Sequence, residues 1–111
     1  MVHIVQEPQR KRVPGGSVVV RDVSSARKFG PLSVLLPPGD VASCDEVIET
    51  TLKILEQQLI AFTDDDYLLL IGDPIAIGMA TSVAAYMNDG RVRFLRWDRQ
   101  RSEYIPVAVQ L

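Results

Sequence analysis

The stretch LLLIGDPIAIGMA, residues 68–80, is an apolar run interrupted once, by Gly72-Asp73-Pro74. Aspartate is a favoured helix N-cap, and proline is favoured at the first helical position because a helix leaves that N–H unpaired anyway. Glycine before the cap lets the backbone turn sharply. The interruption therefore predicts a junction between a buried strand, residues 67–71, and a helix over residues 75–87.

The predicted helix over residues 75–87 is apolar on nearly every side and rich in alanine. A helix of this kind belongs to a core or an interface, and a chain of 111 residues can cover only part of it. We therefore expect a homo-oligomer that buries this helix or the end of the chain. The expected interface residues are Ile77, Met79, Val83 and Trp97.

A second strand and helix precede this junction. Residues 32–36 form an apolar run that Pro37-Pro38-Gly39 ends, because proline cannot donate to a central ladder. Ser43 and Glu46 have the S-x-x-E spacing of a capping box. Apolar residues then recur at helical spacing and predict a helix over about residues 45–61: Ile48, Leu52, Leu55, Leu59 and Phe62.

The remaining strands complete the predicted fold. Residues 91–100 and 104–111 predict an antiparallel hairpin, and residues 17–23 predict a short strand. With two central strand-helix-strand crossovers, the order is β-β-α-β-α-β-β. This order predicts a small Rossmann-like three-layer α/β domain with a parallel core and a C-terminal antiparallel hairpin.

The first sixteen residues differ in character from the rest. Arg10, Lys11 and Arg12 lie between Pro8 and Pro14, punctuation that is rare inside a packed element. We expect a flexible basic arm over residues 1–16, of which residues 1–14 are dispensable for folding, and a single α/β domain over residues 17–111. The three cations either contact an anion or keep the arm solvated.

Composition limits the classes of function. Hydrophobic residues are 47 % and charged residues 23 % of the 111, as in one globular domain. A net charge of −2 gives no overall positive field, so binding to double-stranded nucleic acid is not expected. The single cysteine is typical of a reducing compartment. Neither a leader nor a membrane-spanning segment is recognisable, which favours a cytoplasmic location.

Three loops are expected at the carboxyl ends of the parallel strands, where such sheets bind ligands. They are residues 37–40, Gly72-Asp73-Pro74 and Trp97-Asp98-Arg99. Asp40, Asp73 and Asp98 would suit a divalent cation if they converge, since such cations prefer carboxylate oxygens. As a helix cap, however, Asp73 would repel a phosphate from that helix end.

Other residues that could take part in binding or catalysis could equally have a purely structural role. Asp98 and Arg99 either orient a phosphodiester or form a surface ion pair, and Trp97 either stacks on a base or packs in a core or subunit contact. His3 is the only histidine and lies far from Cys44 in sequence, so we expect neither a nucleophile nor a catalytic set. We expect no metal site and no cofactor, because the phosphate-binding and zinc-ligand spacings are absent.

Residues 22–111 resemble a group of small uncharacterised proteins of tailed bacteriophages from marine and freshwater environments. The matching features are Phe29-Gly30, Asp65-Asp66-Tyr67, Gly72-Asp73-Pro74, Gly90-Arg91, Trp97-Asp98-Arg99 and Tyr104-Ile105-Pro106. The resemblance implies a viral origin, a location in the cytoplasm of an infected bacterial host, and a fold. It assigns no activity.

A looser resemblance covers residues 67–111. A strand, a Gly/Pro turn, a small-residue helix, a strand ending in aspartate and a Tyr-x-Pro strand are similar to the tail of CARF and SAVED domains and of CRISPR-associated ring nucleases. Those families recognise cyclic oligonucleotides over helix N-termini at a dimer interface. The resemblance implies ligand contacts at Gly72, Asp73, Pro74, Asp98 and Arg99.

Two classes of function follow. We expect a small non-enzymatic phage accessory protein that oligomerises or binds a host or viral protein, because the chain is short and lacks a catalytic set. The alternatives are a binder or hydrolase of a nucleotide signal, such as a cyclic oligonucleotide, and a minor virion component.

Overall fold

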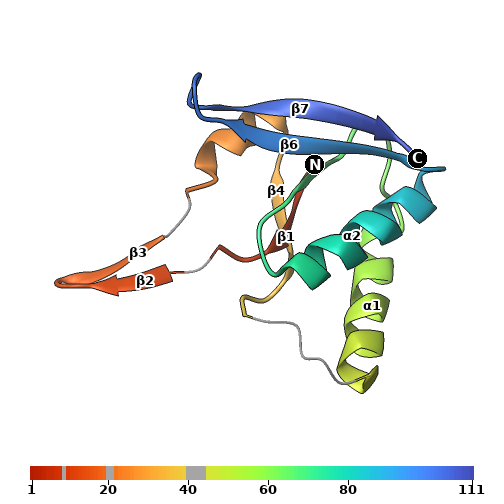
Figure 1. Ribbon diagram of the computed structural model, residues 1–111, viewed down its shortest axis with the longest axis horizontal. Helices are drawn as coiled ribbons and strands as arrows, with labels where there is room; N and C mark the ends of the chain where they lie inside the picture. Colours follow the sequence, from red (N-terminus) through yellow and green to blue (C-terminus); the bar gives the residue numbers. More distant parts are fainter. Residues whose placement is uncertain (9, 20–21, 40–44) are drawn as a thin grey trace.

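The computed structural model describes residues 1–8, 10–19, 22–39 and 45–111. Its body is a five-stranded, mostly parallel sheet in the order β4-β1-β5-β6-β7, with β7 antiparallel to β6 (Figure 1). The elements in chain order are β1 (Val2–Gln6), β2 (Arg10–Val13), β3 (Gly16–Val19), the 3-10 helix η1 (Ser24–Phe29), β4 (Leu32–Leu36), α1 (Asp45–Leu59), β5 (Tyr67–Leu69), α2 (Pro74–Met87), β6 (Arg91–Asp98) and β7 (Glu103–Gln110). The predicted α/β class is confirmed.

The central strand is β1, at the very start of the chain. It pairs in parallel with β4 on one side and β5 on the other, and all five of its residues are buried. The expectation of a flexible arm over residues 1–16 is therefore wrong for Val2–Gln6. Two polar residues, His3 and Gln6, break the continuous apolar run that identifies a strand buried on both faces. The proline and glycine residues that follow from Pro8 onward also favoured a loop over a strand.

Residues 10–19 form a separate two-stranded sheet, the β2–β3 hairpin, which projects from the body (Figure 1). The strand predicted over residues 17–23 overlaps β3, which belongs to this two-stranded sheet, and residues 20 and 21 lie outside the described residues. The first sheet strand is β1 instead, and the predicted element order is corrected accordingly.

The faces of the sheet follow from the handedness of the crossovers. From β1 the chain moves outward to β4 through η1, then returns across β1 to β5 through α1 and onward to β6 through α2. Right-handed crossovers in opposite directions put their helices on opposite faces. Accordingly, α1 and α2 pack in one buried cluster, with Val5 and Leu68, and η1 packs in the other, with Ile4 and Leu69.

The Rossmann-like three-layer description fits only in part. Within the described residues, the layer opposite α1 and α2 is a single 3-10 helix of six residues. Both α-helices share one face because both of their crossovers run in the same direction along the sheet. No helix in the described part of the chain has the length and apolar character that a bilayer crossing requires.

Truncation of the central strand tests its importance. We expect Ile4→Ala to lower the free energy of unfolding by about 2–5 kcal/mol, because it opens a cavity between two ladders. The same change at Ile60, which is 70 % exposed, is the matched control, and we expect it to cost less than about 0.5 kcal/mol. Urea unfolding measures both, and equal effects at the two sites would contradict a buried central β1.

Candidate functional site

The Gly72-Asp73-Pro74 segment begins α2. The Asp73 carboxylate accepts hydrogen bonds from the backbone N–H groups of Ile75 (2.9 Å) and Ala76 (3.3 Å), and Pro74 is the first helical residue. The N-cap interpretation is confirmed. The positive end of the helix therefore already has its own carboxylate.

Gln6 forms hydrogen bonds to this segment, which follows β5, and to the loop that follows β4. At the end of β1, its Nε2 donates to the carbonyl oxygens of Pro37 (3.1 Å) and Gly39 (2.6 Å), and its Oε1 accepts from the N–H of Asp73. Gly72 has φ +133°, and a Cβ placed there would lie 2.3 Å from the Gln6 Oε1. Glycine at this position is thus required both by the backbone conformation and by the Gln6 side chain.

Gln6 lies at the place where a ligand crevice is expected in a sheet of this kind. In doubly wound sheets a ligand binds at the carboxyl ends of the strands, where the chain reverses direction along the sheet. Here that point lies between β1 and β5, and the Gln6 side chain bridges it. Sequence reasoning missed Gln6 because its partners lie 31 to 67 residues away.

The described structure gives separate roles to two of the three aspartates considered as cation ligands. Asp98 accepts from the N–H groups of Gln100 (3.0 Å) and Arg101 (3.4 Å), so it closes the β6–β7 turn while Asp73 caps α2. No group of three His, Cys, Asp or Glu among the described residues is placed to hold a metal ion. Asp40, the proposed third ligand, lies outside the described residues, as do Ser43 and Cys44.

Of the remaining expected ligand residues, Arg99 is exposed in the β6–β7 turn. No hydrogen bond or ion pair in the described structure joins this turn to Gly72-Asp73-Pro74. The five residues expected to bind a nucleotide therefore serve two separate turns.

The four expected interface residues differ in exposure. Val83 is buried in the core, so it is unavailable to a partner, and its prediction is corrected: the small residues of α2 allow close packing that covers it. Ile77 and Met79 are partly buried against the same cluster. Trp97 is 42 % exposed. Whether a second copy covers the rest of α2 stays a prediction.

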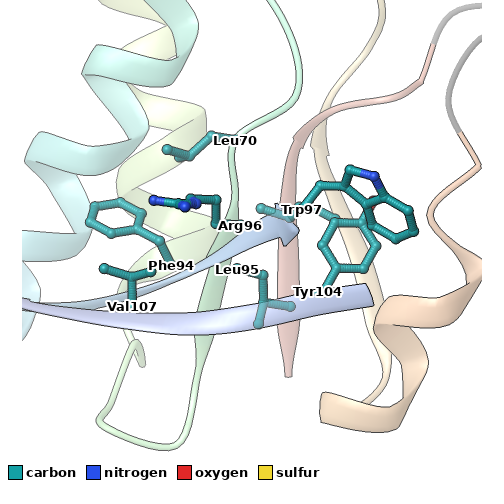
Figure 2. Close-up of a pocket in the computed structure, with 8 residues that line it drawn as sticks. Leu70, Phe94, Leu95, Arg96, Trp97, Tyr104 and Val107 are labelled. Carbon is teal, nitrogen blue, oxygen red and sulfur yellow. The ribbon is translucent and has the colours of Figure 1, made fainter. Parts of the chain in front are cut away.

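Trp97 lines a pocket of about 340 Å³. The other lining residues are Leu69, Leu70, Phe94, Leu95, Arg96, Tyr104 and Val107. Figure 2 shows the Arg96 side chain between Leu70 and Phe94, with Trp97 and Tyr104 together on the other side. The indole meets the Tyr104 ring edge to face, with ring centroids 5.0 Å apart. The pocket is thus lined mostly by apolar residues, and the exposed Arg96 is the one charged residue of its lining.

The pocket exists because two neighbouring strands differ in length. β5 ends at Leu69, which pairs with Leu95, whereas β6 continues to Asp98. The last three residues of β6 therefore have no β5 partner beside them. Successive side chains of a strand point to opposite faces, so Arg96 and Trp97 flank this open edge from both sides.

Several arginines of β6 and of the turn after it have partners. Arg91 pairs with Asp64 (3.0 Å), Arg101 with Asp98 (3.8 Å), and the Arg93 guanidinium lies 4.1 Å from the Tyr67 ring centroid. Arg96 has neither an ion pair nor a hydrogen bond among the described residues. Its charge inside the pocket is therefore not neutralised by a described side chain.

His3 is a buried titratable group away from this pocket. It packs on Phe62, with ring centroids 5.8 Å apart, and its Nδ1 has no partner among the described residues. Burial lowers the pKa of His3, an effect that Asp66 partly opposes. The ring is therefore neutral near pH 7, as a core histidine is.

Comparison with known proteins identifies a family. A family model described as Phage Pam3 gp32-like protein matches residues 1–111. The chain belongs to this family. The predicted phage relationship is thereby confirmed, and it extends over β1 as well as over residues 22–111. No curated protein and no solved structure matches this phage protein, so the resemblance to CARF and SAVED domains is not supported.

One experiment distinguishes the two roles considered for Asp73, a helix cap and a metal ligand. We expect Asp73→Ala to cost about 0.5–2 kcal/mol of stability, and Asp73→Ser or Asp73→Asn much less, because these side chains also cap helices. Added manganese or magnesium should leave the melting temperature of the parent protein unchanged. A rise of several degrees, abolished by Asp73→Asn, would show that the carboxylate binds metal, because a ligand of the folded state stabilises it.

Proposed function

We propose that this phage protein is a non-enzymatic accessory protein that binds another protein of the host or the virus. The binding site is the pocket at the end of β6, and the occupant is an exposed segment in which an apolar side chain lies next to an Asp or Glu. The observation that carries this proposal is the exposed Arg96, without an ion-pair partner among the described residues, in the lining of an otherwise largely apolar pocket.

The lining residues favour a protein partner. Trp, Tyr and Arg are the residue types that most often dominate binding energy at protein interfaces, and Trp97, Tyr104 and Arg96 occur together here. Trp97 and Leu70 remain 42 % and 37 % exposed, so the pocket presents apolar surface to a partner. An apolar side chain of the partner would remove this surface from water.

The positive charge of Arg96 favours a partner with an acidic side chain. A guanidinium binds a carboxylate with two parallel hydrogen bonds, and such charge-assisted bonds are stronger than neutral ones. A lysine or arginine in the partner would be repelled at the same place. Asp73 and Asp98, two of the residues expected to contact a nucleotide, instead accept hydrogen bonds within their own turns, which supports the protein-binding function over the nucleotide alternative.

Trp97 makes the test direct because it is the only tryptophan in the chain. Peptides selected from a displayed random library on the parent protein should combine an apolar residue with Asp or Glu, and should change the Trp97 fluorescence on titration. Arg96→Glu should weaken their binding at least about tenfold, since a hydrogen bond to a charged group contributes roughly 1.5–3 kcal/mol. Arg91→Ala, at the opposite end of β6, is the control and should bind as the parent does.

Two results would contradict the proposal. One is selection of the same peptides by the parent and by Arg96→Glu, and the other is binding without a change in Trp97 fluorescence. A change in Trp97 fluorescence on adding a cyclic oligonucleotide, if it is lost in Arg96→Glu, would instead show that the pocket binds a nucleotide.

A further inference from the structure

The main chain of β6 has an open edge at Trp97. Proline has no N–H, so Pro106 cannot donate to Leu95, and the backbone groups of this pair point away from each other. The Leu111 N–H donates to the Gly90 carbonyl oxygen (2.8 Å), which agrees with this alternation along β6 and β7. Because Trp97 lies two residues after Leu95, its N–H and C=O also point away from β7, toward the side of β5.

β5 does not reach this edge because the chain turns away after Leu69. The Ile71 N–H donates to the Leu69 carbonyl oxygen (2.9 Å), which makes a three-residue turn. The Ile71 carbonyl oxygen then accepts from the Gln6 N–H (3.0 Å), so the chain continues beside β1 and leaves β6. Among the described residues, neither the β5–β6 ladder nor a backbone hydrogen bond outside the strands includes Trp97. Its N–H and C=O are therefore open to a partner strand.

This open edge borders the pocket of the proposed function. Leu70, which follows β5, and Arg96 and Trp97, at the end of β6, all line it (Figure 2). Phe94 packs against the cluster that contains α1 and α2, and Leu95 belongs to the cluster that contains η1. Since side chains alternate along a strand, Arg96 lies on the α2 face of the sheet and Trp97 on the η1 face. An extended segment beside β6 would therefore present successive side chains to Arg96 and to Trp97.

We propose that the partner binds as an added β-strand, an extended segment that continues the line of β5 and pairs with the main chain of Trp97. This inference rests on the proposed function, to which it adds the conformation of the partner and the order of its side chains. In strand addition the main chain contributes hydrogen bonds and the alternating side chains contribute specificity. The partner residue beside Arg96 is Asp or Glu, and its neighbour in sequence, beside Trp97, is apolar.

Peptides selected on the parent protein test the order of the side chains. Neighbouring residues of a strand lie on opposite faces, so the acidic and the apolar residue should be adjacent in the selected sequences. In a helical partner the two would share one face at a separation of three or four positions. Selection of that longer separation would overturn strand addition.

Methylation of single peptide nitrogens tests the main-chain contact. One residue of the motif should donate its N–H to the Trp97 carbonyl oxygen. Methylating that nitrogen should weaken binding at least about tenfold, because the methyl group removes a hydrogen bond and holds the two strands apart. The two neighbouring residues are the matched controls, since their N–H groups point away from β6, and their methylation should have little effect.

Hydrogen exchange of the Trp97 amide tests the same contact on the protein side. In the free protein this amide should exchange faster than that of Arg96, whose N–H points to β7. Peptide at about 100 times its dissociation constant should slow Trp97 exchange by about a hundredfold, because only about 1 % of the sites are then free. The amide of Arg99, exposed in the turn after β6, is the control and should exchange at the same rate with and without peptide.

Failure of strand addition and failure of the proposed function give different results. Peptides whose binding depends on Arg96, but which leave Trp97 exchange unchanged, would keep the pocket as the binding site and overturn strand addition. Equal effects of methylation at all three peptide residues would do the same. If no selected peptide binds at the pocket, both the proposed function and strand addition are overturned.

Discussion

Parallel pairing of Val2–Gln6 with strands on both sides is the interaction on which the rest of the structure depends. β1 separates β4 from β5, so without it the sheet would fall into two parts. Its residues fill both buried clusters, Val5 below the helices and Val2 and Ile4 below η1. At its end, Gln6 holds the loops after β4 and β5 in place.

Local signals predicted much of this fold. The cap and proline at Asp73-Pro74, the helical spacing in α1 and the hairpin of β6 and β7 were all identified from neighbouring residues, because each depends on backbone groups within a few positions. β1 could not be found in this way. Its pairing partners lie about 30 and 65 residues away, and its polar His3 and Gln6 conceal the apolar run that marks a buried strand.

The candidate site was predictable only at Trp97. The expected ligand loops follow a general rule for parallel sheets, but Gln6 occupies the crevice, and Asp73 and Asp98 serve their own turns. The pocket instead results from the short β5 beside the long β6. The sequence predicted a shorter strand over residues 67–71 than over residues 91–100, but it did not indicate that β5 ends as early as Leu69 or that a pocket lies there. Arg96 gains its significance from this geometry, since no spacing of the residues around it in the sequence indicated a binding site.

Native-state hydrogen exchange at the amides of Ile4 and Val5 tests the central role of β1 most directly. A strand paired on both sides and buried on both faces opens only when the whole domain unfolds. We expect these amides to exchange with the same free energy that urea unfolding gives for the domain. Exchange of Ile4 and Val5 at a much lower free energy, while Leu68 and Val92 stay fully protected, would contradict a sheet that depends on its first strand.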